Sequence, residues 1–261
     1  MTNFSSQILA DIEYAADLFR QAERAVVLTG AGISTSSGIP DFRSEGTGLW
    51  AKDEPLEVGS LTTFRHDPEK FYKWFHPLAG QIYKAKPNSA HLALAQLEKA
   101  GRLKKIVTQN IDMLHQKAGS EKVIEMHGTL GTLSCLGCYQ QYGCKDFLPP
   151  YLEHGTIPHC PACGAVLKPD VILFGEQLPH KAWLEAQQAC RDCDLMLVAG
   201  SSLEVLPVAG LPMQAIDRGA HLIIINQTPT YLFVRADINI LENVADIIPQ
   251  IKDQVMYGKT N

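Results

Sequence analysis

Two pairs of cysteines have the spacing of metal-binding knuckles. Cys135 and Cys138 form one Cys-x2-Cys pair, and Cys160 and Cys163 form another after 21 intervening residues. Such pairs bind Zn²⁺ tetrahedrally, at about 2.3 Å for each Zn–S bond. Because four thiolates leave no open coordination position, the sequence predicts one structural zinc ion and no catalytic metal.

The remaining three cysteines do not extend this site. Cys144 has no partner at knuckle spacing, and Cys190 and Cys193 form a third Cys-x2-Cys without a further pair to complete a second zinc site. This third pair spans the end of an expected helix and the approach to a buried strand. It also lacks the preceding βα unit of a thioredoxin motif, so we expect neither a metal nor a redox role for it.

A second candidate site is the glycine-rich turn Gly30–Gly32, which directly follows a short apolar run at Val26–Thr29. A turn of this kind between a strand and a helix lets the backbone approach a pyrophosphate, and the N–H groups of the following helix stabilise its charge. However, Thr35 replaces the third glycine of the G-x-G-x-x-G fingerprint, and no acidic residue ends a clear second strand. Taken alone, the pattern also fits a tight turn without a ligand.

Polar groups follow three further expected strands, at Gln109–Asp112, Gly200–Ser202 and Asn226. In open α/β sheets, ligands bind where the carboxyl ends of the parallel strands meet. Amides, hydroxyls and a carboxylate suit a carboxamide, ribose and phosphate, although a polar strand end by itself is more often the capped start of a helix. The extended segment Lys168–Glu176 fits either a simple interdomain connection or an edge that pairs with a peptide strand.

The elements that must position these residues alternate between strand and helix. Apolar runs predict strands at 26–29, 106–108, 123–124, 195–199 and 222–225. Helices are expected after Ser6 as N-cap, from Asn88 with Leu92, Ala95 and Leu97 on one face, and around 182–190, 208–218 and 244–256. This alternation predicts an α/β fold with a Rossmann-like, mostly parallel sheet covered on both faces.

Two segments interrupt the alternation. Residues 40–87 are rich in aromatic residues and proline without strand signals, and residues 128–169 contain five of the seven cysteines. We therefore expect a smaller domain made of a cofactor-loop and helical insert at 40–87 and a zinc-ribbon insert at 128–169. The nucleotide-binding, Rossmann-like domain would comprise residues 1–39, 88–127 and 170–261.

Composition excludes several classes of protein. The net charge of −5 and the absence of a basic cluster argue against a direct nucleic-acid or membrane partner. In particular, Lys145 is the one full positive charge between Cys135 and Cys163, which argues against a zinc-ribbon nucleic-acid binder. No apolar run reaches the roughly 18 residues of a membrane span. The first twenty residues lack the pattern of a secretory signal, so we expect a cytoplasmic monomer with reduced thiols.

Taken together, the motifs resemble the signature of the sirtuin family, in the family's order and over about residues 20–250. The matching segments are GAGISTSSGIPDFRS at 30–44, TQNID at 108–112 with Leu114-His115 and Ala118-Gly119, His127-Gly128, the two knuckles, Phe174-Gly175-Glu176, Gly200-Ser201-Ser202 and Asn226. The resemblance implies an NAD-dependent protein-lysine deacylase. Such an enzyme consumes NAD as a co-substrate and acts on an acyl-lysine-containing protein or peptide.

The resemblance also implies a role for each matching residue. His127, which can accept a proton from a ribose hydroxyl near neutral pH, and Asn110 would be catalytic, whereas His115 would be structural. The cofactor would contact Gly30, Ala31, Gly32, Ser34, Thr35, Asp41, Phe42, Arg43, Gln109, Ile111, Asp112, Gly200, Ser201, Ser202, Asn226 and Val244. The acyl-lysine substrate would contact Ile172, Phe174, Gly175, Glu176 and Val205.

The reaction implied by the resemblance gives nicotinamide, O-acyl-ADP-ribose and free lysine. No hydride moves, which separates this interpretation from a Rossmann dehydrogenase. A sirtuin-like protein ADP-ribosyltransferase is the alternative, because it would use the same NAD site. Family members that prefer acidic acyl groups carry a tyrosine and, three residues later, an arginine. Here Tyr72 is followed at that offset by Phe75, so we expect acetyl or other neutral acyl groups.

Overall fold

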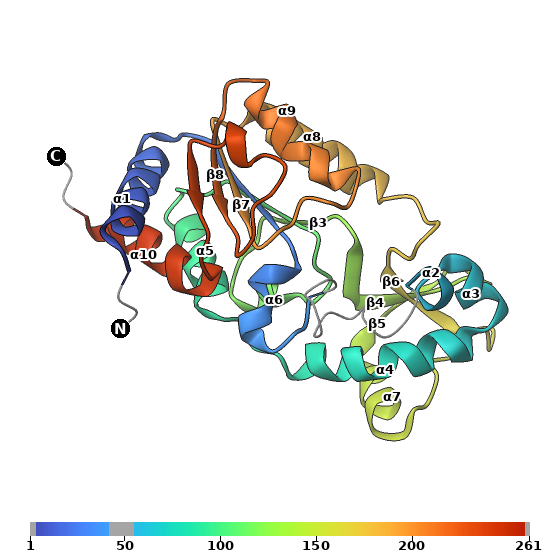
Figure 1. Ribbon diagram of the computed structural model, residues 1–261. Helices are drawn as coiled ribbons and strands as arrows, with labels where there is room; N and C mark the ends of the chain where they lie inside the picture. The colour runs from blue at the N-terminus through green and yellow to red at the C-terminus, as the bar shows by residue number, and fades with distance from the viewer. Residues whose placement is uncertain (1–3, 42–54, 259–261) are drawn as a thin grey trace.

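The larger part of the molecule is built on a six-stranded parallel sheet (Figure 1). The computed structural model describes residues 4–41 and 55–258. The strand order is β3-β2-β1-β7-β8-β9. The strands are β1 (Ala25–Thr29), β2 (Lys105–Thr108), β3 (Val123–Glu125), β7 (Leu195–Ala199), β8 (His221–Ile225) and β9 (Ile238–Ile240). The order reverses between β1 and β7, and such a switch point is where open α/β sheets bind ligands at the strands' carboxyl ends.

Helices cover both faces of this sheet, as Figure 1 shows. Along β7, Leu195 and Leu197 share a core with α1 (Ser6–Gln21), α5 (Ser89–Lys99) and α10 (Val244–Tyr257). The alternate residues Met196 and Val198 face the opposite way and pack against α8 (His180–Asp192) and α9 (Leu211–Ile216). The parallel sheet with a helical layer on each face confirms the predicted α/β architecture. The strands could be predicted as apolar runs because a strand that is buried on both faces needs apolar residues at every position. No helix within the described ranges is long and apolar enough to cross a membrane.

The two inserts pack together beside the large sheet. One contributes α2 (Pro55–Val58), α3 (Leu61–His66) and α4 (Pro68–Lys84). The other contributes a three-stranded antiparallel sheet and α7 (Leu148–His154). That sheet has the order β5-β4-β6, with β4 at Gly128–Cys135, β5 at Gln141–Gly143 and β6 at Leu167–Val171. Phe64, Phe71 and Phe75 share one core with Tyr151 and Leu173. The predicted domain boundary at residue 170 falls inside β6.

Three details of the predicted helices are wrong. Ser5, and not Ser6, caps α1, since its Oγ accepts a hydrogen bond from the Ile8 N–H at 3.3 Å. Leu92 is 46% exposed, because at 100° per residue it lies opposite the buried side of α5 that carries Leu94 and Leu97. The helix expected over 208–218 is instead a 3₁₀ turn at Val208–Gly210 followed by α9, whose first turn contains a proline.

At the switch point, the turn after β1 lies against the backbone that leaves β7. The Gly32 N–H donates to the Gly200 carbonyl at 2.8 Å. A Cβ atom on Gly30 or Gly32 would lie 2.8 Å from that oxygen. Gly200 has a φ of +63°, and a Cβ atom on it would stand 2.3 Å from the Ile33 nitrogen. The glycines are therefore required by backbone contact as well as by turn geometry.

We predict that Gly200→Ala destabilises the fold by about 2–5 kcal/mol, since the new methyl group adds overpacking to a left-handed backbone. Gly219→Ala is the matched control. Gly219 also has a positive φ, of +90°, but a Cβ atom there would have no neighbour within 4 Å. That change should cost only about 1–2 kcal/mol. Urea unfolding measures both values, and equal losses would contradict the proposed contact.

Candidate active site and metal centre

Polar residues from the ends of β1 and β2 form one buried hydrogen-bonded group. Ser34 Oγ donates to Asp112 Oδ2 at 2.6 Å, and the Asn110 amide lies 3.1 Å from both Ser34 Oγ and the Gly30 carbonyl. Asp112 Oδ1 accepts from the Leu114 N–H at 2.8 Å, at the start of α6 (Leu114–Lys117). Burial raises the pKa of Asp112, while the hydrogen bonds from Ser34 and Leu114 oppose that shift. The glycine turn and the segment 109–112 are thus tied together.

Further predicted cofactor residues come from the other half of the sheet. Gln109 Nε2 donates to Ser201 Oγ at 2.9 Å, which joins the end of β2 to the end of β7. Asn226 follows β8, and its Nδ2 donates to the Thr228 carbonyl at 2.8 Å. Val244 is buried at the start of α10. These residues therefore lie at or beside the same edge of the sheet.

The structure leaves part of the predicted cofactor set undescribed. Phe42 and Arg43 lie outside the described residues, so their predicted contacts stay predictions. Thr35 is exposed, and its hydroxyl donates to the Gly32 carbonyl at 3.0 Å. Short 3₁₀ turns at Ala31–Ile33 and Thr35–Ser37 follow β1, in place of the α-helix expected after the glycine turn.

His127 connects β3 to β4 and reaches the same edge. Its Nδ1 lies 2.9 Å from the Gln109 carbonyl, so Nδ1 carries the hydrogen and Nε2 keeps a lone pair. Burial lowers the pKa of His127, and the bond to Gln109 partly opposes this, so the ring is neutral at physiological pH. Gly128, with a φ of +76°, follows it, and a Cβ atom there would stand 2.0 Å from the Asp170 carbonyl. The histidine is thus arranged to act as a base through Nε2.

His115 lies in the interior, where a structural role is expected for it. Its side chain is buried, with Nε2 3.0 Å from Oγ1 of Thr29, the last residue of β1. Burial lowers the pKa of His115 well below its ordinary value, with a smaller contribution from the neighbouring His91. A ring without solvent access cannot exchange a proton with a substrate.

The predicted substrate segment continues from β6. The Ile172 N–H donates to the His127 carbonyl at 2.8 Å. No group among the described residues donates a hydrogen bond to the Ile172 carbonyl. The Phe174 backbone bonds on both sides to the start of α3, with 3.0 Å to the Gly59 carbonyl and 3.0 Å to the Leu61 nitrogen. Among the described residues, the Ile172 carbonyl therefore has no donor, and its own residue is bonded to His127.

The Glu176 carboxylate, predicted to contact substrate, is engaged within the protein. Its Oε2 lies 3.0 Å from Lys168 Nζ and accepts from the Leu173 N–H at 2.8 Å. Lys168 was not singled out from the sequence. A charged residue inside the apolar run LKPDVILF was the signal that could have identified it.

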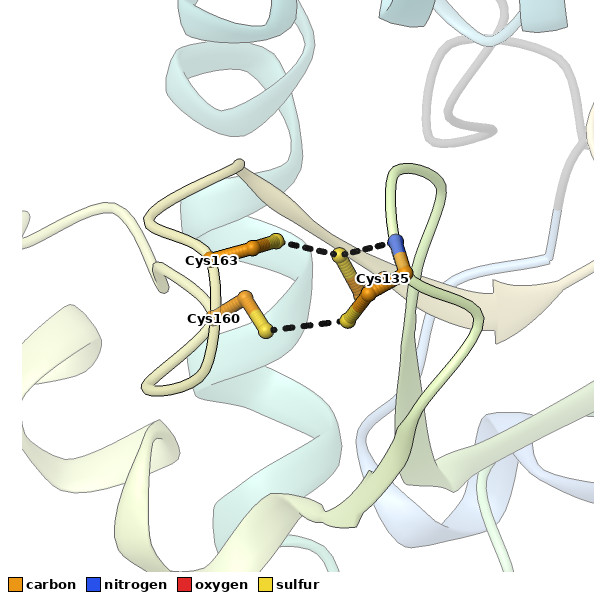
Figure 2. Close-up of side chains that lie close together, drawn as sticks. Cys135, Cys160 and Cys163 are labelled. Carbon is orange, nitrogen blue, oxygen red and sulfur yellow. Dashed lines mark hydrogen bonds between the residues drawn. The ribbon is translucent and has the colours of Figure 1, made fainter.

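The four knuckle cysteines converge on one point. All four sulfur atoms lie within 4.8 Å of one another, with 3.4 Å between Cys135 and Cys163 and 3.5 Å between Cys138 and Cys160. Figure 2 shows the Cys160 and Cys163 side chains pointing toward the loop that carries Cys135. Four ligands at about 2.3 Å from one ion stand roughly 3.8 Å apart, so these thiols fit a tetrahedral Zn²⁺.

The zinc centre lies away from His127. Gly128 and Cys135 are the two ends of β4, and they pair with Val171 and Leu167, which are separated by four residue steps of β6, or roughly 13 Å. Cys190 and Cys193 are buried in the other core, where burial raises the pKa of both thiols. Within the described residues, the one metal-competent cluster is the knuckle set, and its distance from the histidine indicates a structural ion.

We predict about one zinc ion per chain, lost in Cys160→Ser because three thiolates and a hydroxyl bind Zn²⁺ poorly. Cys144→Ser is the matched control, since Cys144 lies in the same insert outside the cluster. Metal analysis after dialysis measures the zinc content. Full zinc retention in Cys160→Ser, or its loss in Cys144→Ser, would contradict the assignment.

Comparison with known proteins agrees with this geometry. The family model described as Sir2 family matches residues 30–207. The chain is 43% identical over 246 residues to NAD-dependent protein deacylase 2 of Archaeoglobus fulgidus, covering 94% of this chain and 96% of that protein. It is 44% identical to NAD-dependent protein deacetylase 2 of Caldanaerobacter subterraneus, covering 88% of this chain and 90% of that protein.

Solved structures give the same result. A Sir2 enzyme structure has a TM-score of 0.87 at 42% identity, covering 95% of this chain and 98% of the other. Sir2Tm bound to a propionylated peptide has a TM-score of 0.83 at 36% identity, covering 93% and 98%. A third, a Sir2 variant with a deacetylated p53 peptide and 3'-O-acetyl ADP ribose, has a TM-score of 0.87 at 36% identity, covering 95% and 99%. The chain belongs to the Sir2 family.

Proposed function

We propose that this protein is an NAD-dependent protein-lysine deacylase that removes acetyl or other neutral acyl groups. NAD is consumed as a co-substrate, and the products are nicotinamide, O-acyl-ADP-ribose and free lysine. One observation carries the proposal: His127 is neutral and oriented by the Gln109 carbonyl, beside the polar ends of the strands. The names and complexes of the family relatives support the same chemistry.

The residues at the switch point bind and orient NAD. The backbone of the turn at Gly30–Gly32 lies close to the pyrophosphate, because glycine places no side chain at either end of the turn. Gln109, Ile111 and Asp112 bind the nicotinamide and its ribose with Asn110 beside them. Ala31, Ser34, Thr35, Asp41, Phe42, Arg43, Gly200, Ser201 and Ser202 complete the site. On the far side, Asn226 accepts from ribose hydroxyls through Oδ1, and Val244 packs on the adenine.

His127 and the acylated lysine meet on the other side of the nicotinamide ribose. When bound, NAD supplies an anomeric carbon from which nicotinamide leaves as the acyl oxygen attacks. His127 Nε2 accepts the proton of a ribose hydroxyl, which its lowered pKa permits at neutral pH. The open Ile172 carbonyl accepts from the acylated lysine nitrogen. Phe174 and Val205 line the path of the side chain, and Gly175 and Glu176 flank the peptide.

The proposal includes the setting in which the enzyme acts. We infer a Rossmann-like domain of residues 1–39, 88–127 and 170–261, with inserts at 40–87 and 128–169. We also infer a cytoplasmic monomer that acts on acyl-lysine proteins without a nucleic-acid or membrane partner. The net charge of −5 supports the exclusion of nucleic acid.

We predict that His127→Ala lowers kcat for an acetyl-lysine peptide by roughly 10²–10⁴-fold, the usual contribution of a general base. The fold should persist, since within the described residues the ring is held by the hydrogen bond to Gln109 alone. His154→Ala, which changes an exposed histidine at the end of α7, is the matched control and should retain normal turnover. Turnover of His127→Ala close to that of the unaltered enzyme would refute the proposed role.

We predict faster removal of acetyl than of succinyl groups from one peptide sequence. The Tyr72 hydroxyl donates to the Leu167 carbonyl at 2.5 Å, and Phe75 is buried in the core of the inserts. Neither side chain therefore offers a charge to a succinyl carboxylate. Mass spectrometry of the two acylated peptides in one reaction compares the rates directly. A higher rate for the succinylated peptide would show that this interpretation is wrong.

A further inference from the structure

A buried ion pair supports the segment that the proposed function assigns to the acyl-lysine peptide. Lys168 Nζ lies 3.0 Å from Glu176 Oε2, and the two side chains are 7% and 19% exposed. The same ammonium donates to the Val171 carbonyl at 2.8 Å and to the Pro169 carbonyl at 3.1 Å. Burying a lysine in this way is costly unless its hydrogen bonds are made, and here three oxygen atoms surround it.

These contacts close the two ends of one chain segment onto each other. Glu176 Oε2 also accepts from the Leu173 N–H at 2.8 Å, and the Glu176 N–H donates to the Leu173 carbonyl at 2.9 Å. Gly175, with a φ of +87°, forms the turn between them. The lysine ammonium thus fixes both the last carbonyl of β6 and the carboxylate beyond the turn.

The closed segment lies between two fixed neighbours. Ile172 is joined to the His127 carbonyl, and Phe174 is joined to Gly59 and Leu61 at the start of α3. The Ile172 carbonyl and the half-exposed Phe174 ring are therefore presented from a backbone whose neighbouring groups are bonded. Lys168 itself is buried under this segment and is not placed to touch a peptide.

We propose that Lys168 is a positioning residue for the acylated peptide. Through Glu176 and the Val171 carbonyl, its ammonium sets the position of the Ile172 carbonyl and of Phe174, and so determines the affinity for the acyl-lysine substrate. This inference rests on the proposed function of the segment. It assigns Lys168 a role in substrate affinity and gives Glu176 an indirect role in place of a direct contact.

The test uses a variant that removes both charges, because a single substitution would leave one buried charge unpaired and risk unfolding. In Lys168→Met/Glu176→Gln, the introduced amide oxygen still offers an acceptor to the Leu173 N–H. We expect the KM for an acetyl-lysine peptide to rise on the order of tenfold to hundredfold. The KM for NAD should stay within about twofold, since the cofactor residues lie on other segments.

The control variant carries a change in a different ion pair. Lys105 Nζ and Glu185 Oε1 lie 2.5 Å apart between β2 and α8, and both side chains are partly exposed. Glu185→Gln should leave both KM values within about twofold, because exposed pairs contribute little. Fluorescence anisotropy with a labelled acetyl-lysine peptide provides an affinity that does not depend on turnover, and circular dichroism checks the folding of each variant.

The outcomes separate a positioning role from a general structural one. A selective loss of peptide affinity in a folded double variant supports the proposal. An unchanged peptide KM and affinity would overturn it, as would a parallel rise in the KM values for peptide and NAD. If the unaltered enzyme does not turn over the acetyl-lysine peptide, the proposed function fails first, and this inference fails with it.

Discussion

The turn after β1 and the chain that leaves β7 can touch only because no Cβ atom stands between them. Gly32 and Gly200 are joined by a 2.8 Å backbone hydrogen bond across the switch point of the sheet. This contact holds the turn that leads to Ser34 against the chain that leads to Ser201. Ser34 is hydrogen-bonded to Asp112, and Ser201 is hydrogen-bonded to Gln109. The polar residues of the candidate cofactor site depend on it, since a side chain at any of these glycines would separate the two halves.

The backbone of His127 is one of the connections between the inserts and this site. The His127 carbonyl accepts from Ile172, while its ring is oriented by Gln109. The proposed base, cofactor residues and peptide segment are therefore linked by short hydrogen bonds rather than by a shared metal. The zinc-binding knuckles lie at the opposite end of β4 and stabilise an insert whose core of four buried residues is too small to be stable on apolar burial alone.

The sequence predicted those features that depend on local patterns. Buried strands such as Leu195–Ala199 read directly as apolar runs, and the knuckles at Cys135 and Cys160 follow a spacing that the metal imposes. Short elements hold little pattern: β9 at Ile238–Ile240 was missed, whereas β3, also of three residues, was predicted over 123–124. Leu92 was assigned to the wrong face of its helix, since small residues such as Ala90 and Ala93 fill most of the buried side.

The site was less accessible from residue patterns, because its contacts join distant segments. No spacing rule distinguishes His127 from the other histidines, and only the resemblance to the sirtuin family identified it. The resemblance also named Glu176, but the geometry shows its carboxylate turned toward Lys168. Likewise, the glycine turn indicated a nucleotide site from the sequence. The other reason for its glycines, the close contact with Gly200, becomes evident only when β1 and β7 are known to be neighbours.

The most direct test of the central claim is a product balance by mass spectrometry. The unaltered protein is incubated with NAD and an acetyl-lysine peptide, and all products are quantified over time. NAD-dependent deacylation predicts nicotinamide, O-acetyl-ADP-ribose and free-lysine peptide in equal amounts, with no ADP-ribose on peptide or protein. Release of nicotinamide with an ADP-ribosylated peptide or protein and no loss of the acetyl group would contradict the account.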